Sequence, residues 1–450
     1  MKAVIAIDSF KGSMDSIEAG EAAEKGIRRV FTDAETIVYP LADGGEGTVQ
    51  ALAKGLGGRL EKVKVTGPLG EPVICEYGIV EEKTAIIEMA GAAGITLVQP
   101  ELRNPLNTTT YGVGEVIKDA IGKGCRHFII GIGGSATNDG GVGMLQALGA
   151  EFLDEGGKQV PFGARGVENL AAINCEHMLP ELKDCDFRIA CDVDNPLCGE
   201  NGCSHIFGPQ KGATPEMAEQ MDQWMEKYAE ITAEYFQNAG NDELEPERKE
   251  NVAEKELQDN PDLMKVKVRV KGKNLSVDAG WKLADIGKNY NSDYPGCGAA
   301  GGLGFAFRAF LRGKLEPGIN IVLEEIGIET AIKDAGIVIT GEGCLDGQTV
   351  MGKAPIGIAR LAKKYGKPVI AFSGAVTEDA AACNQAGIDA FFPILRQVTT
   401  LEAAMSPATA IRNMTAAVEQ TFRLLKMSFI YGKEFKMYSV SPFDFSHRQE

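Results

Sequence analysis

The sequence predicts an α/β fold with a mostly parallel sheet. Residues 3–7 and 36–41 are short apolar runs rich in β-branched side chains. Each is followed by a polar loop that contains glycine and then by an apolar stripe with helical spacing. The same order of strand, loop and helix returns between residues 336 and 392. Regular alternation of strands with helices is typical of parallel sheets.

A change of pattern after residue 57 predicts a second domain. Three closely spaced strands, separated by turn residues, are expected at residues 60–65, 72–77 and 84–88, as in a meander. The chain has 450 residues, about three times the ~150 of a typical domain, and is long enough for two domains. The expected segments are residues 1–57 and 294–428 for the first domain and residues 58–293 for a second, inserted domain.

Two segments stand apart from this alternation. The inserted domain carries an extra charged insertion at about residues 241–293, and roughly half of its first 35 residues are charged, with both signs mixed. We expect a solvated helix and an edge hairpin there. Residues 429–450 are rich in aromatic side chains but have no period, so we expect a poorly ordered or peripherally packed tail.

The composition limits the classes of partner. The formal net charge of −17 opposes binding to nucleic acid or anionic membranes, because the overall field repels polyanions. No apolar run approaches the ~20 residues of a membrane-spanning helix, and the run at residues 3–7 is too short for a signal peptide. Ten scattered cysteines and four histidines argue against a zinc site. We therefore expect a cytoplasmic protein with reduced thiols and no nucleic-acid or membrane partner.

Glycine is over-represented, and its placement indicates a binding site. The chain has 55 glycines, about 12% of its residues against a usual ~7%. Many lie in loops after apolar runs, beside small hydroxyl side chains, carboxylates and lysines. Because the loops at the carboxyl ends of strands collect at one edge of an open α/β sheet, we expect these loops to form one site.

The most glycine-rich loop, residues 131–141, is a candidate phosphate-binding loop. It can expose several backbone N–H groups at the start of a helix, an arrangement that binds phosphate. It is neither a Walker A loop nor a dinucleotide-binding fingerprint, and a tight turn with close helix packing is the structural alternative. The candidate nucleotide-binding residues are Gly133, Gly134, Ser135, Thr137, Asn138 and Asp139, with Gly341, Glu342 and Gly343 from a later loop.

Three side chains are candidates for catalysis. Lys11 lies in the first strand-to-helix loop, where a lysine can reach a transferring phosphate, and a solvated surface lysine is the alternative. Asp192 and Asp194 follow the strand at residues 188–191 and can bind Mg²⁺ or accept the proton of a substrate hydroxyl. The alternative for this pair is a turn before Pro196.

The residues of a covalent hydrolase are missing. The chain has no Gly-x-Ser-x-Gly sequence, and no serine or cysteine stands in a loop with an evident histidine partner. The means of catalysis that remain are positioning of the substrates and electrostatic stabilisation. These are the main requirements of phosphoryl transfer.

Taken in chain order, the loops resemble those of the bacterial-type glycerate kinase family. The resemblance covers about residues 1–425, apart from the charged insertion. The motifs that carry it are residues 8–13, 42–48, 131–141, 191–197, 207–213, 298–304, 340–349 and 352–355. Cys344 stands where the family commonly has arginine. At this position we therefore expect the backbone N–H, and not the side chain, to contact a phosphate.

The resemblance implies ATP-dependent phosphorylation of D-glycerate to 2-phosphoglycerate or 3-phosphoglycerate, with Mg²⁺. It also implies a flavodoxin-like doubly wound sheet in the first domain and a core similar to that of restriction endonucleases in the second. We expect MgATP and glycerate to meet between the domains, with Lys11 and residues 131–141 on the phosphates and a lysine on the glycerate carboxylate. The candidate substrate contacts are Asp8, Ser9, Asp43, Lys211, Asp346 and Lys353. A homodimer is left open.

Two alternatives stay open. One is a kinase of another small hydroxy acid or sugar acid, because glycine loops specify a phosphate better than its acceptor. The other is a nucleotide-sensing regulatory module, although the acidic net charge and the lack of a helix-turn-helix segment disfavour a DNA partner.

Overall fold

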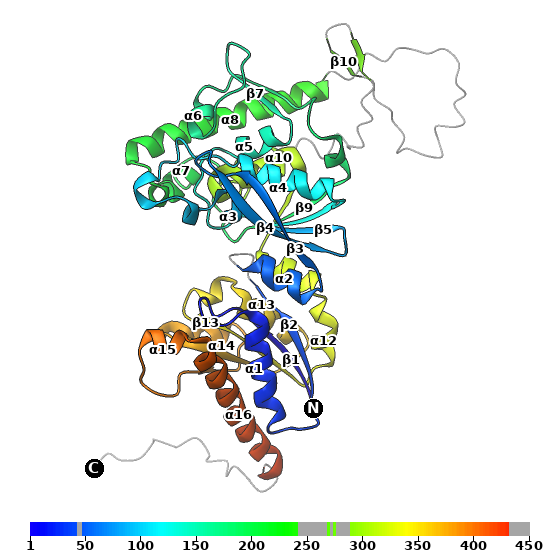
Figure 1. Ribbon diagram of the computed structural model, residues 1–450, viewed down its shortest axis with the longest axis vertical. Helices are drawn as coiled ribbons and strands as arrows, with labels where there is room; N and C mark the ends of the chain where they lie inside the picture. The colour runs from blue at the N-terminus through cyan, green and yellow to red at the C-terminus, as the bar shows by residue number, and fades with distance from the viewer. Residues whose placement is uncertain (43–46, 242–267, 271–272, 276–288, 432–450) are drawn as a thin grey trace, which may run out of the picture. The chain divides into compact units, whose positions relative to one another are not determined.

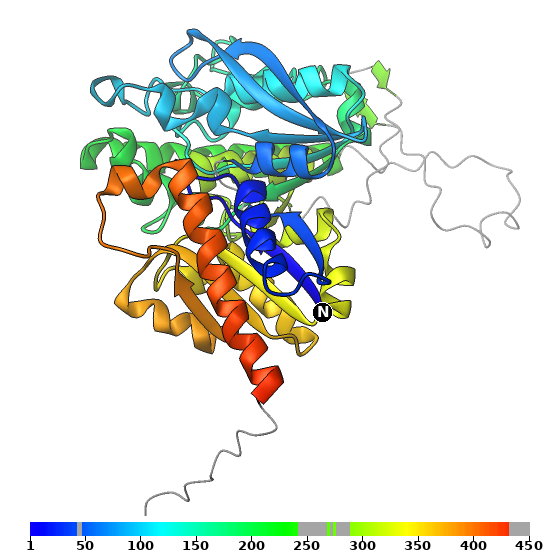
Figure 2. The same ribbon diagram turned by 60° about the horizontal axis from the view of Figure 1, so that its bottom comes forward.

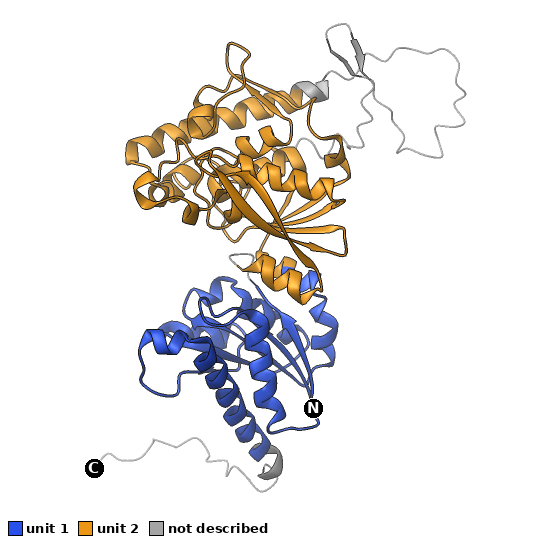
Figure 3. Cartoon of the chain, viewed as in Figure 1, with its two compact units in different colours: residues 1–43, 322–450 blue, residues 44–321 orange. Residues whose placement is uncertain are grey.

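The computed structural model describes residues 1–42, 47–241, 268–270, 273–275 and 289–431. The chain divides into two compact units, coloured separately in Figure 3. Unit 1 comprises residues 1–43 and 322–450, and unit 2 comprises residues 44–321. Most of the charged insertion, and the tail beyond residue 431, lie outside the described residues. Within the insertion, β10 (Val268–Val270) and β11 (Lys273–Leu275) pair as antiparallel strands.

Unit 1 is built on a five-stranded sheet in which every strand pair is parallel. The strand order is β2–β1–β13–β14–β15, or 2-1-3-4-5 when counted along the unit, which is the order of flavodoxin-like doubly wound sheets. The bounds are β1 (Lys2–Ile7), β2 (Glu35–Pro40), β13 (Ile337–Leu345), β14 (Val369–Val376) and β15 (Ala390–Pro393). The predicted α/β class with a parallel sheet is confirmed.

Helices cover both faces of this sheet (Figure 1). α1 (Ser16–Arg28) and α16 (Pro407–Tyr431) lie side by side on one face, where their apolar side chains join those of β1 in one buried core (Figure 2). α13 (Ala354–Lys364) connects β13 to β14. Along the sheet, this connection runs in the opposite direction from the connection of β1 to β2 through α1. A right-handed crossover therefore places α13 on the other face. The unit also contains α12 (Ile328–Asp334), α14 (Ala382–Gln385) and α15 (Leu401–Met405), with the 3₁₀ turns Thr349–Met351 and Glu378–Ala381.

Unit 2 contains a six-stranded mixed sheet with the order β12–β9–β6–β5–β4–β3. The predicted meander is confirmed, because β3 to β5 pair as antiparallel neighbours. From β5 onward the strands are parallel. The bounds are β3 (Arg59–Thr66), β4 (Pro72–Val80), β5 (Thr84–Glu88), β6 (His127–Gly131), β9 (Asp186–Ala190) and β12 (Lys314–Glu316), with β7 (Glu151–Leu153) and β8 (Ala172–Asn174) as a separate pair.

Helices surround the sheet of unit 2. They include α2 (Thr48–Gly55), α3 (Ala90–Ala93), α4 (Tyr111–Gly122), α5 (Val142–Ala147), α6 (Ala164–Glu168), α7 (Cys203–Phe207), α8 (Pro215–Asn241) and α10 (Ala299–Leu311). α11 (Gly318–Glu325) spans the boundary between the units. In the described parts of the chain, no helix combines the length and the apolar character needed to cross a membrane.

The unit boundaries differ from the domain boundaries expected from the sequence. α2 lies in unit 2, where the Val49 N–H donates to the Glu88 carboxylate of β5 at 2.9 Å. Residues 294–321 also lie in unit 2, because β12 pairs with β9 and α10 contributes to the core of the same unit. Local sequence patterns locate helices and strands, but the partner of β12 is set by a long-range pairing that no local pattern encodes.

Candidate active site

The loops after β1 and β13 meet where the connections of the unit 1 sheet reverse direction. Doubly wound folds bind their ligands at this switch point. The Asp8 N–H donates to the Gly341 carbonyl at 2.9 Å. A Cβ built on Gly343 would lie 3.9 Å from the backbone nitrogen of Lys11. The structure therefore brings together two groups of candidate residues that are far apart in the sequence.

The loop between β1 and α1 presents Lys11 at an exposed position on a fixed support. Phe10 and Met14 form a bridge across the loop and are only 4% and 3% exposed. Gly12 adopts a φ of 75°, a left-handed conformation that glycine tolerates without strain. Ser9 is partly buried, and its N–H donates to the Asp8 carboxylate at 2.7 Å. Buried anchors on both sides thus restrict the backbone that carries the Lys11 ammonium.

Glu342 lies in a strand and not in the loop expected for residues 341–349. β13 continues to Leu345, and Glu342 pairs with Ser373 of β14. Gly341 permits the close approach of these strands, because a Cβ at this position would lie 2.0 Å from the carbonyl oxygen of Phe372. Strand pairing fixes the backbone of Glu342 more firmly than a loop would.

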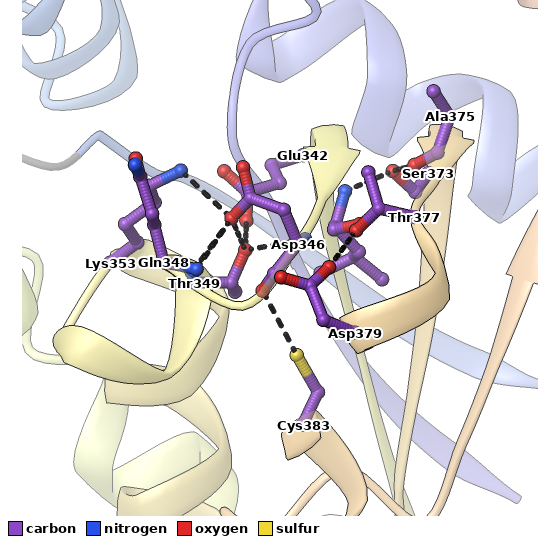
Figure 4. Close-up of polar contacts among 11 residues, drawn as sticks. Glu342, Asp346, Gln348, Thr349, Lys353, Ser373, Ala375, Thr377, Asp379 and Cys383 are labelled. Carbon is purple, nitrogen blue, oxygen red and sulfur yellow. Dashed lines mark hydrogen bonds and ion pairs between the residues drawn. The ribbon is translucent and has the colours of Figure 1, made fainter. Parts of the chain in front are cut away.

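Thr349 joins the carboxylates of Glu342 and Asp346 (Figure 4). Its Oγ1 lies 2.7 Å from Glu342 Oε1 and 3.1 Å from Asp346 Oδ1. Asp346 Oδ1 also accepts the N–H groups of Gln348 and Thr349 at 3.0 and 2.9 Å. Lys353 Nζ lies 3.4 Å from the same oxygen. The candidates Glu342, Asp346 and Lys353 therefore form one polar cluster, called the Asp346 cluster below, with Thr349 at its centre.

The Asp346 cluster holds ionised groups of both signs. Burial alone would raise the pKa of Asp346, but hydrogen bonds from Thr349 and the positive charge of Lys353 outweigh it, so the pKa lies below its ordinary value. Asp346 is thus ionised at neutral pH. Lys353 immediately precedes α13, and the positive end of a helix dipole favours anions. This edge of unit 1 can attract a phosphate or carboxylate while its own carboxylates accept hydrogen bonds from hydroxyl groups.

The end of β14 supports the cluster (Figure 4). The Leu345 N–H donates to Ser373 Oγ at 3.0 Å, and the Thr377 N–H donates to the Leu345 carbonyl at 3.0 Å. The Thr377 hydroxyl donates to Asp379, whose Oδ2 would lie 2.3 Å from a Cβ built on Gly347. The turn that carries Asp346 is therefore fixed from the side of β14.

The sequence prediction gave no role to Thr349 or Ser373. The signal for Thr349 was the spacing Asp346-x-x-Thr349, because an aspartate commonly accepts hydrogen bonds from groups two or three residues further along a turn. No comparable signal marked Ser373, since its contact with Leu345 depends on the pairing of β13 with β14.

In unit 2, most of the candidate phosphate loop is buried. Gly133 and Gly134 are exposed, whereas Ser135 is 8% exposed and Asp139 is 1% exposed. Asp139 accepts the N–H and the hydroxyl of Thr110 at 2.8 and 2.9 Å. It also accepts the N–H of Gly141 at 3.2 Å. Burial raises the pKa of Asp139, although these hydrogen bonds act in the opposite direction. Asp139 therefore anchors the loop to the start of α4.

Lys211, a candidate substrate contact, lies in the interior of unit 2. It is 2% exposed, and its Nζ donates to the carbonyl of Thr137 at 2.6 Å. The neighbouring Asn138 is also buried and donates to Ser204 Oγ at 3.0 Å. Burial lowers the pKa of the Lys211 ammonium to about 8. This geometry favours a structural role, in which Lys211 holds the candidate phosphate loop from within.

The pKa of Lys211 predicts an unusual pH dependence of stability. Folded Lys211 releases its proton near pH 8, whereas the unfolded chain keeps it to about 10.5, so between these values raising the pH favours the folded state. Across this window, the wild type should gain about 3 kcal/mol in free energy of unfolding relative to Lys211→Met. Urea denaturation at a series of pH values measures the difference. Parallel curves for the two proteins would contradict the prediction.

Asp192 and Asp194 are exposed at the end of β9. Asp192 Oδ1 accepts the N–H of Gly318 at 3.0 Å, at the start of α11. This contact with Gly318 differs from the local turn before Pro196, which was the structural alternative for the two aspartates. Among the described residues, no group of three or more histidine, cysteine, aspartate or glutamate side chains is arranged to hold a metal ion. Asp43, another candidate, lies outside the described residues.

The doubly wound unit with its charged switch-point loops and the second unit with its glycine loop fit the class of α/β phosphotransferases that act on small molecules. A sequence model of the glycerate kinase family matches residues 3–251 and 262–426. The chain therefore belongs to the glycerate kinase family, and it is a kinase whose acceptor is an alcohol group.

Individual relatives cover nearly the whole chain. It is 44% identical over 430 residues to the glycerate kinase of Haemophilus influenzae, covering 95% of this chain and 100% of the relative. It is 43% identical over 424 residues to the glycerate 2-kinase of Escherichia coli, covering 93% and 98%. A crystal structure assigned as glycerate kinase 2 from Salmonella typhimurium LT2 matches with a TM-score of 0.78 and 40% identity, covering 96% and 99%.

Proposed function

We propose that this protein transfers the γ-phosphoryl group of ATP to a hydroxyl of D-glycerate, giving 2-phosphoglycerate or 3-phosphoglycerate. The observation that carries the proposal is the convergence of Lys11 with the Asp346 cluster at the switch point of unit 1. Identity to glycerate kinases over nearly the full chain supports glycerate as the acceptor. The similarity to a relative named glycerate 2-kinase favours the 2-hydroxyl.

The chain's own residues would supply positioning and charge. Lys11 would stabilise the negative charge of the transferring phosphoryl group, because a lysine acts as a compact point charge on phosphate. Of the two lysines considered for the glycerate carboxylate, the geometry favours Lys353, which is partly exposed beside the start of α13. Lys211 is buried and already donates to a backbone carbonyl. Glu342 would accept a hydrogen bond from a hydroxyl of the nucleotide or of the acceptor.

In unit 2, the exposed amides near Gly133 and Gly134 would contact the nucleotide phosphates. Asp192 and Asp194 offer carboxylate oxygens two residues apart, a donor set that fits a Mg²⁺ ion retaining its waters and its phosphate ligands. Bound Mg²⁺ would neutralise charge on the phosphates. The alternative role for this pair is to accept the proton of the glycerate hydroxyl. The expectation that both substrates meet between the domains stays a prediction.

Substitution of the two aspartates should separate their roles. Asp192→Asn and Asp194→Asn should each lower kcat by roughly 10²-fold. For the residue that binds the metal, the Mg²⁺ concentration for half-maximal rate should also rise. The exposed Asp184 of the same unit provides the control variant Asp184→Asn, which should behave as wild type. Wild-type rates and an unchanged Mg²⁺ requirement in both active-site variants would exclude these assignments.

Two measurements test the proposed reaction. ADP release, measured with a coupled assay over a panel of hydroxy acids and sugar acids, should be fastest with D-glycerate. Phosphorus NMR of the product then identifies the hydroxyl that is phosphorylated. If a different acid is phosphorylated faster, that acid and not glycerate is the substrate. Binding of ATP without turnover of any acceptor would favour a nucleotide-sensing module. Light scattering of the same sample tests whether the protein is a homodimer, and cell fractionation tests the expected cytoplasmic location.

A further inference from the structure

The Thr349 hydroxyl has one proton and two carboxylate neighbours. Its Oγ1 lies 2.7 Å from Glu342 Oε1 and 3.1 Å from Asp346 Oδ1, so the proton goes to the closer acceptor, Glu342. The same oxygen accepts the Asp346 N–H at 3.1 Å. A directed chain of hydrogen bonds therefore runs from the Asp346 backbone through Thr349 to the Glu342 carboxylate (Figure 4).

This arrangement makes the two carboxylates different from each other. Asp346 Oδ1 is satisfied by the backbone N–H groups of Gln348 and Thr349 and by the nearby Lys353 ammonium. Asp346 therefore keeps donors when the Thr349 hydroxyl is removed. Glu342 accepts the hydroxyl proton, and this contact restricts a glutamate side chain that has several rotatable bonds.

The position of Thr349 also limits what can replace its hydroxyl. The side chain is 0% exposed, and its 3₁₀ turn packs next to the start of α13. An isosteric valine would fill the same space and leave no room for a water molecule in place of the hydroxyl. The Asp346 N–H and Glu342 Oε1 would then each lose a partner.

We propose that Thr349 is a positioning residue, which orients the Glu342 carboxylate toward the substrates. The inference rests on the proposed function, because Glu342 is the group that would contact a nucleotide or acceptor hydroxyl. Thr349 itself is buried, so it acts through the groups that it contacts and not on a substrate directly. A carboxylate displaced by about 1 Å can cost on the order of 10²-fold in rate.

The test compares substitutions that keep or remove the hydroxyl. Thr349→Val should lower kcat/KM by 10-fold to 100-fold, whereas Thr349→Ser, which keeps the hydroxyl, should stay within about 3-fold of wild type. Thr340 supplies a matched control, because it is equally buried in β13 and its hydroxyl has no hydrogen-bond partner among the described residues. Thr340→Val should retain wild-type kinetics. Thermal unfolding of each variant confirms that folded protein is being compared.

A double-mutant cycle separates positioning from a general structural role. If Thr349 acts through Glu342, Thr349→Val should have less than a third of its effect when introduced into Glu342→Ala, which has no acceptor for the Thr349 hydroxyl. Equal effects in both backgrounds, or equal losses for Thr349→Val and Thr349→Ser, would overturn the inference. If Thr349→Val does not fold, Thr349→Ala removes the same hydroxyl without adding volume and takes its place in every comparison.

The two proposals fail in different ways. Wild-type protein that phosphorylates no hydroxy acid would refute the proposed function. Active wild-type protein whose kinetics are unchanged by Thr349→Val would refute only the role of Thr349.

Discussion

Replacing Lys11 with alanine should reduce phosphoglycerate formation by about 10²-fold to 10³-fold. This is the effect of removing one preorganised electrostatic contact to a transition state. The loss should appear mainly in kcat, because the charge to be stabilised develops during transfer. Steady-state kinetics at saturating ATP and glycerate measure the effect. Lys11→Arg keeps the charge but changes its geometry, and it should restore only part of the rate.

The fold of Lys11→Ala should remain intact. Lys11 is exposed, while Phe10 and Met14, which anchor its loop, are unchanged by the substitution. The free energy of unfolding should therefore stay within about 0.5 kcal/mol of wild type. Lys25, another exposed lysine of the same unit, supplies the control variant Lys25→Ala, which should keep full activity. Retention of most wild-type turnover by Lys11→Ala would remove Lys11 from the catalytic residues.

The sequence predicted the elements of the switch point because their signals are local. An apolar run followed by a glycine-containing polar loop marks the end of β1, and this is where the structure places Lys11. The same pattern located Asp346 and Lys353. Their convergence could be expected because parallel strands place their carboxyl ends at one edge of a sheet.

Burial was much harder to predict. Lys211 and Asp139 occur in polar, glycine-containing segments that look like exposed loops, yet the structure buries both. A charged side chain is buried only when other parts of the chain supply its partners. Here the carbonyl of Thr137 receives Lys211, and Thr110 donates to Asp139. Neither partner is adjacent in the sequence, so no local pattern could distinguish a ligand contact from an internal anchor.

Loss of the buried Asp139 carboxylate should greatly destabilise unit 2. Replacement with asparagine preserves its shape but exchanges one acceptor oxygen for an amide donor. That donor then faces the N–H of either Thr110 or Gly141, because these groups donate to different carboxylate oxygens. Removing the negative charge also leaves the buried Lys211 ammonium without the nearby carboxylate that favours its charged form. Breaking such a buried arrangement typically costs about 3–5 kcal/mol.

Asp139→Asn should therefore unfold at a markedly lower urea concentration than wild type and bind ATP more weakly, because Asp139 ties the loop at residues 131–141 to the start of α4. Urea denaturation and calorimetric ATP binding measure the two effects, with Asp184→Asn as the exposed control. If Asp139 contacted the nucleotide directly, ATP affinity would fall while the denaturation midpoint stayed at its wild-type value. The predicted loss of stability separates an internal anchor from a ligand contact, since only the anchor is needed when no nucleotide is bound.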